Sequence, residues 1–221
     1  MKKSILALIL AGAAGVASAD SVNLTYDGQG TYGSTLTVSL SGGLFFQNGS
    51  SSTNIWAGRL AVTVDGQSAE TYCTELTQWA ASGVFDIIAL PDAPRPGEGM
   101  GQTKADAIQQ LYNATNGAMD VDTDAEAAAF QAVIWEIVYD YDGTEATMST
   151  TAGNVQMLGV NASLFNLYRG YANANGDKTP YVAAYTNDTA QDMLFTVIPL
   201  PGAALMAGLG LAGVVIRRRR A

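Results

Sequence analysis

The residue with the clearest capacity for covalent chemistry is Cys73, the only cysteine among 221 residues. Its thiol has no second cysteine with which to form an internal disulfide. A lone thiol of this kind forms an intermolecular link, acts as a reactive nucleophile, or packs as a small apolar side chain. Which of these roles applies depends on the side chains that the fold brings near the thiol.

Gln131 is a side chain that such a thiol would attack. It lies on a predicted helix one turn before Trp135, so the two side chains share a helix face. Phe130 and Ile134 belong to the adjacent apolar sector, which places Gln131 at the edge of the predicted core. A half-buried amide must be hydrogen-bonded or it costs free energy. The other solution is covalent: a cysteine thiolate attacks the amide carbon, ammonia leaves, and a side-chain thioester forms.

The remaining residues argue against an enzyme. Histidine is absent, which removes the usual general base for a cysteine or serine nucleophile and the usual zinc ligand. The sequence contains no Gly-rich phosphate loop, nucleophile elbow or metal-ligand cluster, so we expect no cofactor and no metal. Glu136 and Asp140 lie one turn apart, and solvated helix carboxylates are the simpler interpretation of that spacing.

The acidic segment 120–124 resembles the first half of a calcium loop. That pattern next requires glycine and ends on an acidic residue, where this chain has Ala125 and Gln131. Carboxylates at a helix start, with Thr123 and Glu126 forming a capping box, explain the segment more simply. A loose calcium site remains the alternative.

Hydrophobic periodicity predicts strands in the first half of the chain and helices in the second. We expect strands over 34–40, 55–64, 70–76, 84–90, 181–185 and 193–197, and helices over 103–113, 123–139 and 154–172. Asp65-Gly66 predicts a hairpin turn, and the Pro- and Gly-rich segment 91–99 predicts an exposed linker. The fold class is therefore α+β: a β-sandwich or barrel from the N-terminal half, with a helical segment packed on it.

Two short motifs resemble those of the thioester domain of bacterial surface adhesins. Tyr72-Cys73 is similar to the family's aromatic-Cys motif in a strand, and Phe130 to Trp135 is similar to its hydrophobic-Gln-x-x-hydrophobic-Trp motif in a helix. The resemblance, over roughly residues 50–195, implies a thioester between Cys73 and Gln131. This bond would react once with an amine or hydroxyl on a surface protein or polysaccharide, and we expect Tyr72 and Trp135 to shield it from water.

The alternative to this thioester is a non-covalent matrix or carbohydrate-binding module in which the cysteine is inert.

Either function belongs to an exported protein, and the two ends of the chain have the composition of targeting segments. Residues 1–19 combine Lys2 and Lys3 with an apolar run and small residues before Asp20, which predicts a cleaved signal peptide.

The C-terminal segment 196–221 joins a proline motif to an uncharged stretch long enough for a transmembrane helix. Four arginines follow, and the positive-inside rule places them in the cytoplasm. The motif residues are Pro199, Leu200 and Pro201, and the arginines are Arg217, Arg218, Arg219 and Arg220.

This order of features resembles the PEP-CTERM sorting signal of Gram-negative bacteria, in its Val-Pro-Leu-Pro-Ala variant. The resemblance implies an exosortase-type processing enzyme as a partner. It also implies transient residence in the inner membrane, followed by transfer to the cell envelope or the extracellular matrix. A plain single-pass tail anchor is the alternative.

Residues 20–195 then form one exported domain with a strongly acidic surface. All twenty acidic residues fall there against five basic ones, so the net charge of this region is −15. Such a surface repels nucleic acid and anionic lipid, so we expect no nucleic-acid partner. It suits divalent cations or high ionic strength.

Overall fold

A computed structural model of the chain describes residues 21–179 and 182–196. The predicted signal peptide over 1–19 lies outside these residues. The predicted sorting motif, transmembrane helix and arginine cluster, from Pro199 to Arg220, lie outside them as well. Within the described ranges, no helix has the length and apolar character needed to cross a membrane.

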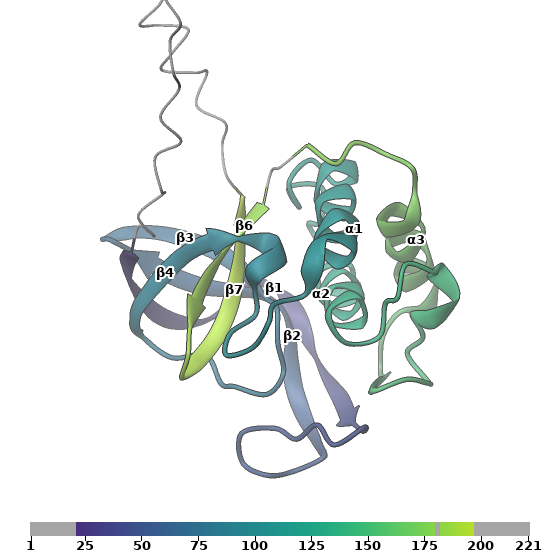
Figure 1. The fold of residues 1–221 in the computed structure, drawn as a ribbon, viewed down its shortest axis with the longest axis horizontal. Helices are drawn as coiled ribbons and strands as arrows, with labels where there is room; N and C mark the ends of the chain where they lie inside the picture. The colour runs from purple at the N-terminus through teal and green to yellow at the C-terminus, as the bar shows by residue number, and fades with distance from the viewer. Residues whose placement is uncertain (1–20, 180–181, 197–221) are drawn as a thin grey trace, which may run out of the picture.

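In the described residues, seven antiparallel strands form one sheet that curls on itself (Figure 1). They are β1 (Ser21–Leu40), β2 (Ser52–Val64), β3 (Gln67–Cys73), β4 (Gly83–Ala89), β5 (Val155–Leu158), β6 (Val182–Asn187) and β7 (Ala190–Thr196). The neighbours run β2–β3–β7–β6–β4–β1, and β1 also pairs with β2, so six strands close a ring. This architecture falls within the predicted sandwich or barrel, but two of the six strands in the ring, β6 and β7, come from the end of the described chain rather than from its N-terminal half.

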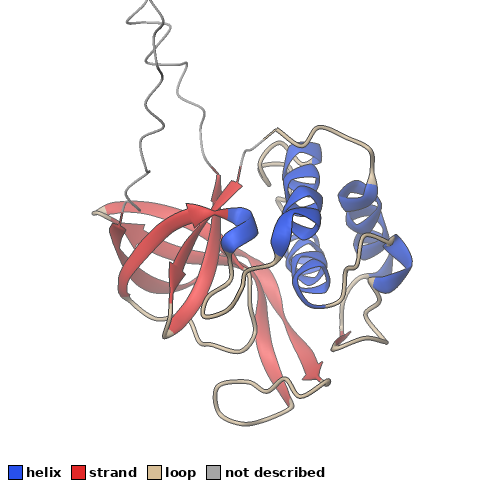
Figure 2. Ribbon diagram, in the orientation of Figure 1, coloured by secondary structure: helices blue, strands red, loops and turns tan. Residues whose placement is uncertain are grey.

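The helices of the described region gather on one side of the sheet (Figure 2). They are α1 (Gly101–Ala114), α2 (Asp124–Tyr139) and α3 (Ala162–Asn173), with short 3₁₀ helices η1 (Leu90–Asp92) and η2 (Glu145–Thr147). α2 packs against β1 and β2 and also contacts α1 and α3. Every residue from Ala127 to Val138 is buried, as expected of a helix that is apolar on nearly all sides. This central helix carries Gln131.

Two local sequence signals have the predicted outcome. Asp65 and Gly66 form the turn between β2 and β3 with φ angles of +46° and +82°, the left-handed values that a two-residue hairpin requires. At the start of α2, the Thr123 hydroxyl accepts a hydrogen bond from the N–H of Glu126 at 3.3 Å. The Glu126 carboxylate accepts in return from the Thr123 hydroxyl at 2.8 Å and from the N–H of Asp122, the residue before the cap, so the box closes one residue earlier than its usual form.

The predicted helix over 154–172 is wrong in its first third. Residues 155–158 form strand β5, which pairs with the end of β1. The backbone of Gly159 then adopts φ +98°, a value that ends the strand and excludes a continuous helix. α3 starts only after Asn161, whose side chain accepts from the N–H groups of Ser163 and Leu164.

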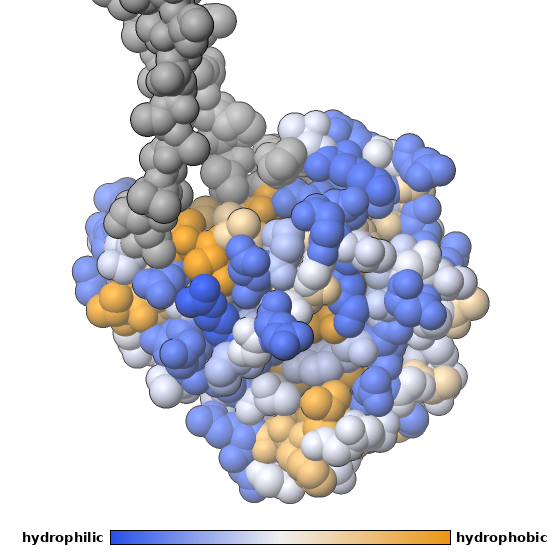
Figure 3. Space-filling view, in the orientation of Figure 1, coloured by the Kyte–Doolittle hydropathy of each residue, from blue (hydrophilic) through white to orange (hydrophobic). Residues whose placement is uncertain are grey.

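Two further boundaries differ from the prediction. β1 begins at Ser21 rather than at residue 34, and register shifts interrupt its pairing with β2 in the glycine-containing segment 26–33. The segment 91–99 is not a free linker. Ala93 is fully buried, and the N–H of Arg95 donates to a carboxylate oxygen of Asp192 at 2.6 Å. The face of the molecule drawn in Figure 3 is mostly hydrophilic, and a few small hydrophobic patches are scattered over it.

Candidate functional site

Cys73 lies at the end of β3, at the point where this strand loses a neighbour. β2 pairs with β3 only as far as Thr71. On the other edge, β7 pairs with Cys73 through Met193. The backbone groups of Cys73 on the β2 side therefore need partners from outside the sheet, because buried N–H and C=O groups are costly to leave unpaired.

The side chain of Gln131 supplies both of these partners. The N–H of Cys73 donates to Gln131 Oε1 at 2.9 Å, and Gln131 Nε2 donates to the carbonyl oxygen of Cys73 at 2.9 Å. This two-way exchange copies a hydrogen-bonded pair of an antiparallel ladder. Both residues are buried, with exposed fractions of 0% for Gln131 and 3% for Cys73. The carboxamide is thus held in one orientation against the residue that carries the thiol.

A second glutamine of the described residues makes the same exchange. Gln109 of α1 donates to the carbonyl oxygen of Val182 at 2.8 Å and accepts from the N–H of Val182 at 3.0 Å. A glutamine clamp on a strand end is therefore a structural device in this fold. The clamp made by Gln131 differs because the clamped residue, Cys73, carries a nucleophile.

The thiol itself contacts a residue that the sequence did not predict. Cys73 Sγ donates to Gln191 Oε1 at 3.1 Å, and Gln191 Nε2 donates to the backbone oxygen of Glu75 at 2.6 Å. Gln191 belongs to β7 and is buried. The sequence carries one weak signal for it, since Gln191 and Asp192 are polar residues in an otherwise apolar closing strand.

Burial is the dominant electrostatic influence at this site. It raises the pKa of the Cys73 thiol, and the nearby charge of Glu75 raises it further, so the sulfur is an uncharged thiol at neutral pH. Burial also raises the pKa of Glu75 to about 7 and that of Asp192 to about 7. The two acidic residues are linked, because Glu75 Oε1 accepts from the N–H of Asp192 at 3.3 Å.

The two residues expected to shield the site are both buried, but they lie differently. Trp135 has no exposed surface and follows Gln131 by one turn of α2. Tyr72 packs on Phe130, with ring centroids 4.8 Å apart, and makes an edge contact with Tyr112. It therefore covers the helix-facing side of β3, and it lines a pocket of about 380 Å³ that does not include Cys73.

A separate pocket of about 240 Å³ reaches the sulfur side of the site. Cys73 and Gln191 form part of its wall, together with three aromatic residues, Tyr26, Trp56 and Trp79. The aromatic residues come from β1, from β2 and from the segment after β3. Cys73 is thus nearly inaccessible to water, yet it lies against a pocket that opens outward.

The helix carboxylates have structural tasks. Glu136 is fully buried, and its Oε2 accepts from the N–H of Ser149 at 2.9 Å, so the prediction of a solvated carboxylate is wrong for this residue. Asp140 accepts from the N–H groups of Asn154 and Val155. Neither belongs to the Cys73 site. In the described part of the chain, no group of three or more Asp, Glu, His or Cys residues is placed to hold a metal ion.

No protein-family model matches the chain, and no curated protein matches it. Among solved structures, it is similar to the N-terminal thioester domain of a surface protein from Clostridium perfringens, with a TM-score of 0.40 and 11% sequence identity. This match covers 74% of the chain and 99% of that domain. A likeness this distant says nothing about function, for which the geometry around Cys73 is the relevant observation.

Proposed function

We propose that this chain is an exported surface or matrix protein that forms a thioester between Cys73 and Gln131 and uses it once to attach covalently to a nucleophile. The observation that carries the proposal is the clamp: the only thiol in the chain belongs to the residue that holds the Gln131 carboxamide by both of its ends. The domain is then a single-turnover tether rather than an enzyme.

Formation of the bond is balanced without a co-reactant. The Cys73 sulfur attacks the side-chain carbonyl carbon of Gln131, and a sulfur–carbon bond forms. The bond from that carbon to Nε2 breaks, the thiol proton passes to the nitrogen, and ammonia leaves. The N–H of Cys73 already donates to Gln131 Oε1, the oxygen on which negative charge develops, so it stabilises the tetrahedral intermediate.

In the attachment step, the Cys73 sulfur is the leaving group. An amine attacks the same carbon, the sulfur–carbon bond breaks, and a proton from the amine returns to Cys73 as its thiol. The product is an amide between the nucleophile and residue 131. Burial of Cys73 and Gln131 supports a lasting thioester, because water that would hydrolyse the bond has little access.

A non-covalent binding module with an inert cysteine is the second candidate. The hydrogen bond from the Cys73 thiol to Gln191 favours it, since this contact satisfies a protonated sulfur without any reaction. The matching clamp of Gln109 on Val182 favours it too, because there the same geometry has no chemistry.

The intact mass of the purified protein separates the two candidates. A thioester lowers the mass by one ammonia, and a small amine such as methylamine then restores a thiol and adds its own mass at Gln131. We expect both changes in the wild-type protein and neither in the Cys73→Ala or Gln131→Glu variants.

Gln109→Glu is the matched control, because it alters the equivalent clamp without touching the thiol. It should keep both the lower mass and the methylamine addition. A wild-type protein of full sequence mass that gains nothing from methylamine would establish the binding-module function instead.

The export route remains part of this proposal. Support for it comes from the sequence features of residues 1–19 and 196–221, which imply a signal peptide, a transient stay in the inner membrane and an exosortase-type partner. A covalent tether of this kind has its targets outside the cell, so the proposed chemistry agrees with the proposed location.

A further inference from the structure

The pocket beside Cys73 has walls of aromatic rings, although it leads to a buried sulfur. Tyr26, Trp56 and Trp79 line it with Asn54, and Cys73 and Gln191 form its inner part. Trp79 keeps an exposed fraction of 37%. A pocket of about 240 Å³ is small for a drug-sized ligand, and it is of a size that admits one end or one unit of a larger molecule.

The tryptophans are fixed in position before any ligand arrives. Trp56 Nε1 donates to the backbone oxygen of Arg59 at 2.9 Å. The Trp79 ring lies parallel to the ring of Phe46, with an interplanar angle of 3° and centroids 5.9 Å apart. The backbone of Trp79 is held on one side by the Gln47 side chain and on the other by the N–H of Gln191. Ordered rings lose little entropy when a ligand binds to them.

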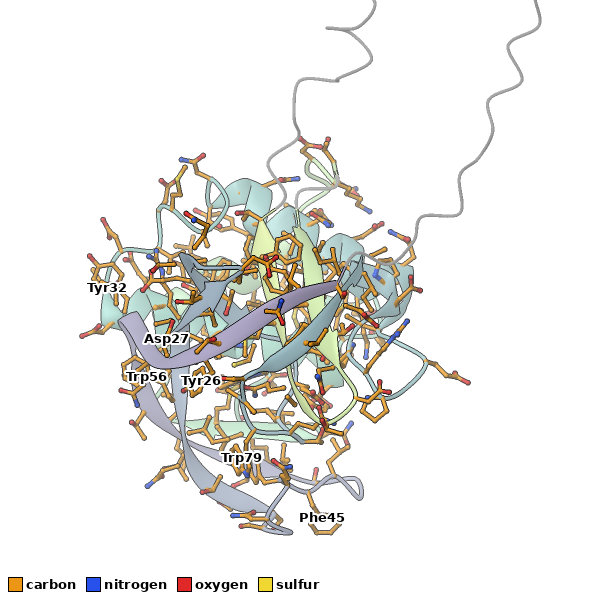
Figure 4. All side chains as sticks on the ribbon, turned by 90° about the vertical axis from the view of Figure 1, so that its left-hand side faces the viewer. Tyr26, Asp27, Tyr32, Phe45, Trp56 and Trp79 are labelled. Carbon is orange, nitrogen blue, oxygen red and sulfur yellow. The ribbon has the colours of Figure 1, made fainter. Side chains whose placement is uncertain are left out.

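The aromatic surface extends beyond the pocket. Figure 4 shows Trp56, Tyr26, Trp79 and Phe45 following one another across this side of the molecule. We call these four residues the aromatic strip. Phe45, at one end, has an exposed fraction of 54%, so its ring is open to a ligand. A strip of this kind fits an extended ligand better than a compact one.

The pocket chemistry selects an amine over a hydroxyl as the nucleophile. None of the described residues that line it carries a charged side chain, and the chain has no histidine, so no base faces a hydroxyl there. Burial raises the pKa of Tyr26, so its hydroxyl also stays protonated. An amine needs no such base, because entry into an apolar pocket lowers the pKa of its ammonium and releases the free amine.

The net charge of the domain restricts which kind of polymer can carry this amine. The region from 20 to 195 has a net charge of −15, and the exposed Asp27 lies beside Tyr26 in Figure 4. Anionic polymers are repelled and cationic ones attracted. An ammonium group also interacts favourably with aromatic faces. A row of flat aromatic rings also matches the apolar C–H faces of successive sugar rings.

From these observations we infer that the aromatic strip binds a polysaccharide that bears free amino groups, and that the pocket delivers one of these amines to the Cys73–Gln131 bond. This inference rests on the proposed thioester. Ring stacking on Trp79 and Phe45 positions the chain, and the Nδ2 group of Asn54 is available to a sugar hydroxyl, since its Oδ1 already accepts from Thr37.

The test compares three probes on the purified protein: an oligomer of glucosamine, the same oligomer with every amine acetylated, and methylamine. Covalent addition is followed by intact mass. The glucosamine oligomer should add at concentrations at least about tenfold lower than methylamine, because stacking contributes binding that a small amine lacks. The acetylated oligomer should add nothing, yet it should slow addition of the free-amine oligomer.

In Trp79→Ala, we expect the preference for the glucosamine oligomer over methylamine to fall about tenfold. Leu167→Ala, which alters another exposed apolar residue on α3, is the control and should keep the wild-type preference. If methylamine adds but the oligomer shows no preference, or if a lysine-rich protein adds more efficiently than the oligomer, the inference is wrong while the thioester stands. If methylamine itself adds nothing, the thioester proposal has failed first.

Discussion

At the scale of single residues, the two glutamine clamps differ in the side chain of the residue that they hold. Gln131 and Gln109 hold the ends of β3 and β6 through the same pair of hydrogen bonds. Val182 offers only methyl groups next to its clamped amide, whereas Cys73 offers a sulfur. The fold thus orients both amides for a structural reason, and in the proposed function the sulfur of Cys73 is what allows a reaction at one of them.

The burial of Cys73 predicts a thiol that reacts slowly even when it is free. Burial raises its pKa, and the thiolate is the form that reacts. In Gln131→Glu, native alkylation by iodoacetamide at pH 8 should be on the order of a hundredfold slower than alkylation of the same protein unfolded in denaturant. Timed alkylation followed by mass spectrometry measures both rates.

Equal native and denatured rates in that experiment would show that the thiol is accessible and its pKa ordinary. The expected result also has a practical consequence. Resistance of the wild-type protein to thiol reagents does not by itself indicate a thioester, because a buried free thiol behaves in the same way. The intact mass is therefore the measurement that decides.

The sequence predicted some residues of the site and could not predict others. Cys73 and Gln131 were identifiable because each belongs to a short motif with a recognisable neighbour. Gln191 reaches the thiol only because β7 pairs with β3 across more than a hundred residues of chain. Trp79 lines the pocket through the path of a segment without regular structure. Positions fixed by non-local pairing leave no local pattern.

At the scale of elements, α2 holds the site and also carries a buried acid. Burial, as the largest cause, raises the pKa of Glu136 to about 9 in the folded state, above its ordinary value of 4.5. The folded protein then binds more protons than the unfolded chain between these values. The contribution of Glu136 to the free energy of unfolding therefore falls as the pH rises from about 4.5 to about 9.

Glu136→Gln should remove most of this contribution to the pH dependence. An amide at position 136 can still accept from the N–H of Ser149, and it carries no charge to bury. We expect the variant to be more stable than the wild type at pH 8, by as much as a few kcal/mol, and to differ little at pH 4. Denaturant unfolding at the two pH values measures this. A constant difference across pH would show that Glu136 is ionised in the fold.

The capping box at the start of α2 gives a second element-scale prediction. Thr123→Ala removes the hydroxyl that accepts from the N–H of Glu126, and it should lower the free energy of unfolding by about 1 kcal/mol. Thr144→Ala is the matched control, because Thr144 precedes η2 without a side-chain cap. Chemical denaturation of the two variants compares them, and equal losses would assign no special role to the cap.

Elements with strong local signals were predictable, and those without were not. The capped helix α2 and the Asp65-Gly66 hairpin follow from side-chain periodicity and turn chemistry. The strand β5 did not, since four residues that pair only with the end of β1 look like the first turn of the helix after them. The start of β1 was hidden by glycines at its register shifts, which weaken the alternation that marks a strand.

At the scale of the whole molecule, both ends of the described chain lie on the side of the barrel away from the loop between β1 and β2 (Figure 1). They are not adjacent in the sheet: Thr196 pairs with Val182 at one end of β6, whereas Ser21 pairs with Asp86, which lies opposite Thr186 near the other end of β6. The loop between β1 and β2, which carries Phe45, lies at the opposite end (Figure 1). A protein held by its C-terminal segment would therefore direct that end of the aromatic strip away from its anchor.

The same arrangement bears on the proposed processing at Pro199, Leu200 and Pro201. β7 completes the ring of strands and ends at Thr196, so cleavage at the motif removes no strand of the barrel. We expect protein from the envelope or the medium to end near this motif by mass spectrometry, with the same unfolding midpoint as the uncleaved form. Replacing Pro199 and Pro201 by alanine should leave full-length protein in the inner membrane. Wild-type protein found only in the inner membrane, still ending in its arginines, would identify the segment as a permanent tail anchor.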